Sequence, residues 1–229
     1  NLADYQINFK TLTAPDLNPP IIKYTEPLDG EFLRADAVDV ALRVGVNRPS
    51  TCKYSETYTE DYYSMTEEFS SCSTIATGLG HYECVTTIPV EQTVTAYVLC
   101  ESEEGVANKE PLEWTVSKSP ELLITQVSPE GILFNNQITL QVYTSGGADS
   151  ANAICSYKQR GSSFSYVDMS NDPTSYHEQN IILNKGDYVY DILCTDYIGN
   201  SVETTIEFTI TEDLEASELQ SVYYLSGTV

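Results

Sequence analysis

The chain has 229 residues, of which 41% are hydrophobic, and it carries 34 acidic side chains against 11 basic ones, a formal net charge of −23. This apolar fraction is large enough for an ordinary buried core, which excludes an intrinsically disordered chain. The acidic surplus excludes nucleic acid and anionic membrane surfaces as partners, because lysine and arginine are needed to neutralise phosphates. The sequence has no run of about 18 apolar residues, so no membrane span is expected.

Residues 1–20 are expected to form a strand followed by a proline linker. Tyr5, Ile7 and Phe9 alternate with polar residues, which is the period-two pattern of a half-buried strand. Three prolines between positions 15 and 20 exclude a helix there and predict a stiff, extended linker. An amphipathic strand on such a linker has to bury its apolar face on its own domain or on another molecule.

Residues 21–118 predict a first β-domain. Alternating apolar residues, with turn residues between them, indicate seven strands: Ile21–Thr25, Val38–Val44, Cys52–Tyr54, Tyr58–Met65, Tyr82–Ile88, Val94–Cys100 and Leu112–Val116. The segment 67–80 is rich in serine, threonine and glycine and is expected to be a loop.

Residues 119–211 predict a second domain of the same kind. Its expected strands are Leu122–Val127, Ile138–Val142, Cys155–Tyr157, Phe164–Met169, Tyr176–Leu183, Tyr188–Cys194 and Val202–Ile210. A constant step of about 94 residues indicates an internal duplication; it carries Tyr82 onto Tyr176, Ile88 onto Ile182, Leu99 onto Leu193, Cys100 onto Cys194 and Trp114 onto Phe208. Residues 212–229 remain as a C-terminal tail, in which 212–222 favour a short helix.

The spacing of these elements predicts the fold class. Seven short strands per domain, about 8–15 residues apart with turn residues between them, are typical of an antiparallel β-sandwich. The expected fold is therefore all-β, with two tandem sandwiches and an N-terminal extension strand.

The six cysteines can pair in 15 ways. Zinc is not expected, because there is no Cys-x-x-Cys pair and the chain has only two histidines. The duplication instead predicts three disulfide bonds: Cys52–Cys100, Cys155–Cys194 and Cys72–Cys84. Disulfides indicate an oxidising compartment outside the cytosol. The first residue is Asn1 and not Met, which is consistent with a mature protein whose targeting segment has been removed.

No catalytic residues are predicted, and the chain is not expected to be an enzyme. His81 and His177 each lie at the start of the corresponding strand of their repeat, and both are interpreted as surface strand residues. No Gly-x-Ser-x-Gly nucleophile motif occurs. The seventeen tyrosines allow a sugar-stacking face, but packing at the rim of the core is the favoured interpretation.

No cofactor is expected, with structural calcium left as an alternative. Acidic oxygens at the ends of sandwiches commonly bind calcium. The candidate ligands do not follow the spacing of an EF-hand; they are Glu101, Glu103 and Glu104 in the first repeat, and Asp191 and Asp196 in the second.

The second repeat carries a family resemblance. Cys155-Ser-Tyr157, Phe164, Met169 and the run Cys194-Thr-Asp-Tyr-Ile-Gly-Asn200 together resemble the Ig-like modules of secreted and cell-surface prokaryotic proteins, archaeal ones especially. The first repeat departs from this pattern, because Glu101-Ser-Glu-Glu-Gly105 replaces the Asp-x-x-Gly-Asn turn. The resemblance implies two Ig-like domains and an extracellular or cell-surface location.

The N-terminal residues carry a second resemblance. Residues 1–13 with their proline linker are similar to the donor strands of some archaeal pilus and thread subunits, which insert into the next subunit. This resemblance implies a structural subunit of an extracellular filament, with copies of itself as partners in a head-to-tail polymer. Two alternatives stay open: a cell-surface adhesin or ligand-binding pair of Ig-like modules without polymerisation, and an accessory part of a secreted enzyme.

Overall fold

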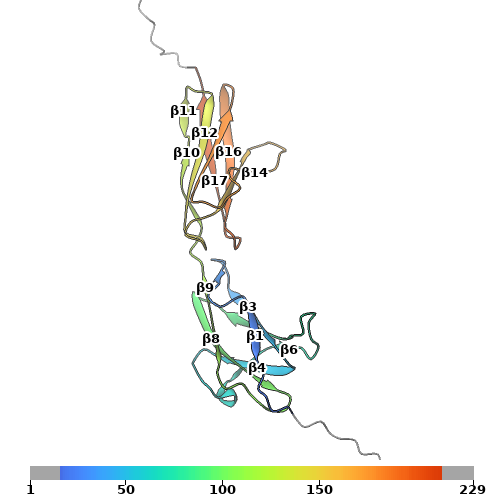
Figure 1. Cartoon of the computed structure of the whole chain (residues 1–229). Helices are drawn as coiled ribbons and strands as arrows, with labels where there is room; N and C mark the ends of the chain where they lie inside the picture. Colours follow the sequence, from blue (N-terminus) through green and yellow to red (C-terminus); the bar gives the residue numbers. More distant parts are fainter. Residues whose placement is uncertain (1–15, 213–229) are drawn as a thin grey trace, which may run out of the picture. The chain divides into compact units, whose positions relative to one another are not determined.

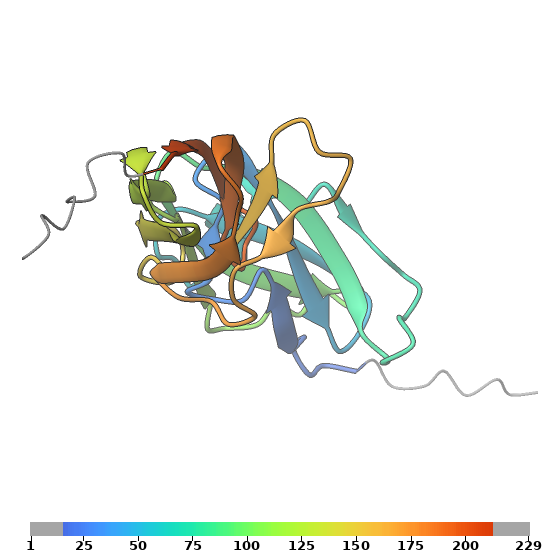
Figure 2. The same ribbon diagram turned by 90° about the horizontal axis from the view of Figure 1, so that it is seen from above.

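The computed structural model of the chain describes residues 16–212. The expected donor strand with Tyr5, Ile7 and Phe9 lies outside these residues, as does nearly all of the expected C-terminal helix. The chain divides into two compact units, unit 1 up to Lys118 and unit 2 from Ser119 onward. Their strands are labelled in Figure 1, and Figure 2 gives the view from above.

Unit 1 is a sandwich of two sheets. One sheet has the strand order β1 (Ile22–Glu26), β3 (Asp39–Val46), β7 (Tyr82–Pro89) and β6 (Ser71–Cys72). The other has the order β2 (Phe32–Leu33), β9 (Leu112–Lys118), β8 (Thr93–Ser102), β4 (Ser50–Ser55) and β5 (Glu67–Glu68). All neighbouring strands are antiparallel except β2 and β9, which run parallel.

The core of unit 1 follows from the period of two along its strands. Leu42 and Val44 on β3 are fully buried, while Arg43 between them points to solvent. Trp114 on β9 is also fully buried, and its indole N–H donates to the carbonyl of Pro27 at 2.9 Å. This bond satisfies the one polar group of the ring where water has no access.

Unit 2 repeats this architecture with one strand fewer. Its first sheet has the order β10 (Leu123–Ser128), β12 (Gln137–Ser145) and β15 (Tyr176–Ile182). Its second sheet has the order β11 (Gly131–Leu133), β17 (Ser201–Ile210), β16 (Gly186–Thr195), β13 (Ile154–Gln159) and β14 (Val167–Asp168). The prediction of an all-β chain with two tandem Ig-like sandwiches is confirmed.

The central strands match the predicted ones, whereas two predicted strands are wrong. Residues 58–65 contain a 3₁₀-helix, η1 (Tyr62–Ser64), in which the Tyr63 N–H donates to the Asp61 carboxylate. Tyr62 and Met65 are both buried, and a spacing of three suits this helix and not a strand. In Phe164–Met169 only the two residues of β14 pair as a strand, and the expected loop 67–80 contains the short strands β5 and β6.

The duplication is real, but its fixed step of 94 residues fails outside β8 and β16. Ala96 pairs with Trp114, whereas Tyr190, 94 positions after Ala96, pairs with Ile206, so Ile206 and not Phe208 is the counterpart of Trp114. On β7 the buried Ile88 would map onto Ile182, which is 73% exposed; the neighbouring Ile181 faces the core. Loops of different length change the register between strands, and a shift of one residue exchanges the two faces.

Candidate functional site

All six cysteines form disulfide bonds. The three pairs are those that the duplication predicts: Cys52–Cys100, Cys72–Cys84 and Cys155–Cys194. Each bond joins residues directly opposite each other on neighbouring strands of one sheet, with Cα–Cα distances of 4.0–4.1 Å. All six cysteines lie among the described residues, and no bond ties the two sheets of a unit together.

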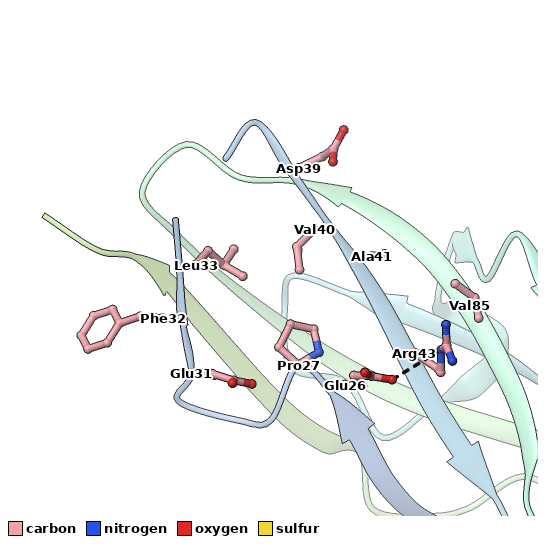
Figure 3. Close-up of a pocket in the computed structure, with 10 residues that line it drawn as sticks. All are labelled: Glu26, Pro27, Glu31, Phe32, Leu33, Asp39, Val40, Ala41, Arg43 and Val85. Atoms are coloured by element: carbon pink, nitrogen blue, oxygen red, sulfur yellow. Dashed lines mark ion pairs between the residues drawn. The ribbon is translucent and has the colours of Figure 1, made fainter. Parts of the chain in front are cut away.

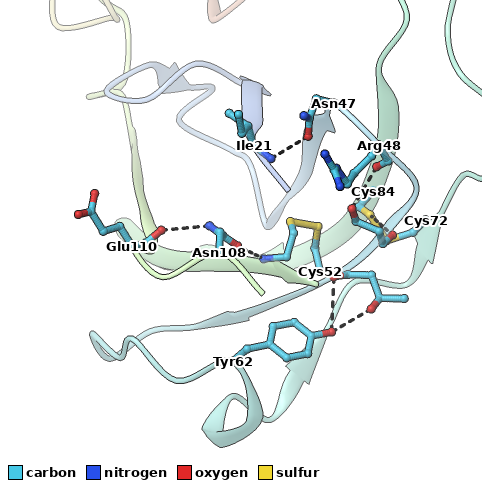
Figure 4. The surroundings of a disulfide bond; sticks show 12 residues. Ile21, Asn47, Arg48, Cys52, Tyr62, Cys72, Cys84, Asn108 and Glu110 are labelled. Atoms are coloured by element: carbon cyan, nitrogen blue, oxygen red, sulfur yellow. Dashed lines mark hydrogen bonds between the residues drawn. A yellow bond between two sulfur atoms is a disulfide. The ribbon is translucent and has the colours of Figure 1, made fainter. Parts of the chain in front are cut away.

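Hydrogen bonds explain why these positions accept a disulfide. The N–H of Cys100 donates to the side-chain oxygen of Asn108, and its carbonyl accepts from the Asn108 N–H, so its backbone points away from β4. Figure 4 shows the surroundings of this disulfide, with Cys52 and Asn108 labelled. Cys52 and Cys100 are therefore a non-hydrogen-bonded pair, the kind in which the two side chains of an antiparallel ladder come closest.

Metal binding finds no support in the sulfur cluster of unit 1. The sulfurs of Cys52, Cys72 and Cys84 lie within 4.8 Å of one another, the only such group of candidate ligands among the described residues. All three sulfurs are in disulfides, so they offer no thiolate to a metal.

Three of the five acidic residues considered for calcium have protein partners. Tyr63 donates its hydroxyl to Glu101, and Arg160 binds Asp191 at 2.6 Å. The buried Asp196 accepts from the backbone N–H groups of Ala148, Ile198 and Asn200, and from the Asn200 side chain. Glu103 and Glu104 are exposed in the turn after β8. A cation at Asp191 or Asp196 would have to displace these donors.

The expectation of two surface histidines is wrong for His177. His81 is half-buried just before β7, but His177 on β15 is only 1% exposed. One of its ring nitrogens lies 3.0 Å from the carbonyl oxygen of Thr174, and the other has no partner. Burial lowers the pKa of His177, opposed by this hydrogen bond, so the ring is neutral in the folded state at neutral pH.

An unpaired strand edge lies in unit 1, on β3. The last residue of β1 paired with β3 is Glu26, opposite Arg43, whereas β3 already begins at Asp39. After Glu26 the chain crosses to the other sheet, where it forms β2. The described residues therefore place no strand beside Asp39–Leu42 on this side.

A pocket of about 500 Å³ adjoins this edge of β3. Figure 3 shows Leu33 and Val40 on its two sides and Pro27 between them. Its rim is charged: Glu31 and Asp39 line it, and Arg43 forms an ion pair with Glu26 at 3.7 Å. It therefore combines a short unpaired edge with an acidic entrance.

A longer unpaired edge lies in unit 2, on β15. This strand pairs with β12 along its whole length and is the last strand of its sheet among the described residues. In unit 1 the corresponding strand, β7, is covered on that side by β6, held by the Cys72–Cys84 disulfide. The six-residue segment between Met169 and Tyr176 forms no strand in unit 2.

An apolar cleft of about 370 Å³ lies between the β15 edge and the second sheet of unit 2. Ile181, Tyr157 and Tyr190 line it, together with Phe164 and Val167, whose side chains are 78% and 53% exposed. Exposed apolar side chains grouped around a cleft are a mark of an interaction site. The sequence signal for this cleft is the shorter second repeat, 39 residues between its paired cysteines against 48 in the first.

Comparison with known proteins adds fold-level likenesses. No protein-family model matches the sequence, and no curated protein matches it either. Among solved structures, the chain resembles the fibronectin(III)-like modules of Clostridium thermocellum CbhA, with 14% identity and a TM-score of 0.45 over 84% of this chain and 94% of that one. It also resembles Sidekick-1 immunoglobulin domains 1–4, with 13% identity and a TM-score of 0.41 over 84% and 49%.

A third likeness is to extracellular domains 3–5 of Drosophila OTK, with 10% identity and a TM-score of 0.39 over 83% of this chain and 62% of that one. These similarities are too low to carry a function.

The described part of the chain contains no helix with the length and hydropathy needed to cross a bilayer. The described part of the chain forms two tandem β-sandwiches, each built of two sheets.

Proposed function

We propose that this chain is a structural subunit of an extracellular filament, in which residues 3–13 of one copy add as a strand to a sheet edge of the next copy. The observation that carries the proposal is that, within residues 16–212, both units leave a strand edge unpaired beside a cleft. The same chain carries an alternating apolar segment at Tyr5, Ile7 and Phe9. The sheet edges of one copy therefore have room for a strand, and the N-terminal segment of another copy has the sequence pattern of one.

The physical reason lies in the backbone. An open edge presents N–H and C=O groups without protein partners, and a strand from a neighbour satisfies them while its alternate side chains fill the cleft. Because donor and acceptor are different surfaces of the molecule, the contact is head-to-tail. Such a contact continues into a fibre unless the rotation between copies closes a ring.

Three disulfides support an extracellular setting for this assembly. Disulfides persist in oxidising compartments and are rare in the cytosol. In this role the sandwiches provide a rigid body and an edge, and no catalytic chemistry is required of them.

Removal of the donor segment tests the proposal. Purified full-length chains are expected to form filaments in negative-stain electron microscopy, whereas chains lacking residues 1–13 are expected to remain folded monomers by circular dichroism and ultracentrifugation. Ile7→Asp should also abolish assembly, because it places a charge on the apolar face. The matched control Asn8→Asp places the same charge on the polar face and should assemble. Normal filaments from the truncated chain would overturn the proposal.

A surface adhesin without polymerisation is the second candidate. It is favoured by exposed tyrosines in unit 1, where the Tyr58 ring packs edge-on against Tyr97 at 5.4 Å and Tyr63 is exposed nearby in sequence. Aromatic faces of this kind bind sugars and peptides. In that case full-length chains stay monomeric, and Tyr58→Ala with Tyr63→Ala reduces attachment of the purified protein to cell surfaces.

A further inference from the structure

We infer that the acceptor is the β15 edge of unit 2, and that its occupant is residues 4–10 of a second copy of this chain. This inference rests on the proposed function and adds which of the two edges described above beside a cleft, on β3 or on β15, receives the strand. The choice follows from backbone direction, from the lining of the clefts and from the strand that occupies the equivalent edge in unit 1.

Backbone direction shows which groups of β15 are available. The Thr144 N–H donates to the Ser175 carbonyl, and the Leu183 N–H donates to the Asn136 carbonyl. The odd-numbered residues of β15 therefore form the backbone hydrogen bonds to β12. Bonding alternates along an antiparallel ladder, so even-numbered residues direct their backbone groups to the opposite side. Glu178, Asn180 and Ile182 therefore face the open edge. Seven residues of β15 match the seven residues 4–10 in length.

Side-chain direction places the apolar face of the incoming strand. His177, Gln179 and Ile181 are the β15 residues on the inner face of the sheet. A strand added beside β15 has its own inner residues at the same spacing of two. Tyr5, Ile7 and Phe9 have this spacing, so with Ile7 next to Gln179 all three lie on the inner face, whichever way the strand runs. The one beside Ile181 reaches the cleft, which adjoins Ile181 and Ile182 at the end of β15.

The cleft beside β15 and the pocket beside β3 differ in how well they suit the apolar face of the incoming strand. The β15 cleft is lined by Phe164, Val167 and Ile181 and includes a basic side chain, Lys158. The pocket beside β3 has three acidic residues at its rim and only a four-residue unpaired stretch, Asp39–Leu42. An apolar strand of seven residues fits the first and not the second.

Unit 1 shows what a strand at this position does. Its strand β6 pairs with β7 at Val85 and Cys84, on the side that β15 leaves open. Phe69, just before β6, is buried in the core against Tyr54. The second copy's segment would supply to unit 2 the strand that unit 1 takes from its own chain.

Peptide binding distinguishes the two edges without requiring assembly. The probe is a fluorescent peptide of residues 1–13, and the receptor is the chain lacking residues 1–13. Asn180→Pro removes an N–H at the β15 edge, and Ala41→Pro is the matched change at the β3 edge; neither backbone N–H bonds to the neighbouring strand of its own sheet. Asn180→Ala removes only the side-chain hydrogen bond from Thr139 on β12 and controls for its loss. Asn180→Pro is expected to weaken binding by about tenfold or more, and Ala41→Pro to leave it unchanged.

The outcomes separate this inference from the proposed function. If Ala41→Pro weakens binding and Asn180→Pro does not, or if neither does, the β15 edge is not the acceptor, although residues 1–13 can still drive assembly. A peptide that fails to bind the unsubstituted receptor also overturns the inference. An Ile7→Asp peptide controls for specificity, and circular dichroism of each receptor ensures that lost binding is not lost folding. If full-length Asn180→Pro chains still form filaments, the inference is wrong.

Discussion

At the scale of single residues, Asp196 shows how one buried carboxylate closes a turn. It accepts four hydrogen bonds, from the N–H groups of Ala148, Ile198 and Asn200 at 2.9–3.1 Å and from the Asn200 amide at 2.7 Å. Burial raises the pKa of Asp196, but the hydrogen bonds from Ala148, Asn200 and Ile198 outweigh it, and the pKa lies below its usual value. The charged form is therefore the one that stabilises unit 2.

We predict that Asp196→Ala destabilises unit 2 by about 2–4 kcal/mol, because several buried donors lose their partner. The free energy of unfolding from urea titration measures this loss. The exposed Glu203→Gln is the control and should have little effect. In the unsubstituted chain the contribution of Asp196 is fully present above the unfolded-state pKa and is lost as pH falls through the lower, folded-state pKa. An Asp196→Ala chain as stable as the control would contradict this role.

His177 predicts a second pH dependence, with its own window. The folded-state pKa lies below 6.5 because the ring is buried. Below pH 6.5 the unfolded chain takes up a proton that the folded chain does not, so stability falls as pH decreases from about 7 to the folded-state pKa.

His177→Gln should remove this dependence on pH. The measurement is the thermal unfolding midpoint of unit 2 at pH values from about 7.5 to about 5.5, above the range in which carboxylates titrate. His81→Gln, which removes the other histidine, is the control and should retain the slope. Equal slopes in all three proteins would show that His177 is not the responsible group.

At the scale of elements, alternation predicts the strands that bury one face. Val40, Leu42 and Val44 on β3, and Leu140 and Val142 on β12, follow this pattern and are buried as expected. The short strands β2, β5, β6, β11 and β14 have two or three residues each. So few residues show no period, and partners far away in the sequence decide whether they pair. The open edge of β15 was not predicted for this reason, since it depends on a short strand that the described part of unit 2 does not form.

Which face of a strand is buried is harder to predict than whether the strand forms. A fixed step of 94 residues carries Ile88, which is buried, onto Ile182, which is exposed. A shorter loop before β15 moves the correct match to Ile181 and turns His177 inward. The disulfide pairing was predictable because Cys100 and Cys194 lie on the strand pair where the step of 94 does hold.

The pairing of β6 with β7 allows a direct prediction about edge protection. Cys72→Ser with Cys84→Ser removes the disulfide that holds β6, and unit 1 should lose about 2–3 kcal/mol, since the closed loop is short. Hydrogen exchange should accelerate at the amides of Glu83 and Val85, which face β6. Protection at the Val44 amide on β3 should change less. Unchanged exchange at Val85 would show that β6 is held without the disulfide.

At the scale of the whole molecule, the two units have a similar architecture but differ at one sheet edge. Unit 1 holds its outer strand with a disulfide, whereas unit 2 has His177 where Cys84 would be, and none of the residues 119–212 forms a strand beside it. The duplication was evident from the sequence, and this difference was not, because it consists of a shift in register and a missing strand. The proposed assembly depends on that difference.

The position of each disulfide bond, between neighbouring strands of one sheet, has a mechanical consequence. When the chain is pulled from its two ends, force passes across the Cys52–Cys100 and Cys155–Cys194 bonds, and the residues between the bonded cysteines cannot extend. The cysteine separations are 48 and 39 residues. At about 3.4 Å per residue, these segments correspond to about 160 Å and about 130 Å of hidden length.

Single-molecule force spectroscopy measures this hidden length. Reducing agent should lengthen the extension released per unit by these two amounts, and equal extensions before and after reduction would contradict the argument. The sheets of one unit can separate under load because no disulfide bond joins them, yet each unit lengthens only by the residues outside its bonded cysteines. A fibre built from such units would absorb a sudden pull by a limited elongation and then resist through covalent bonds.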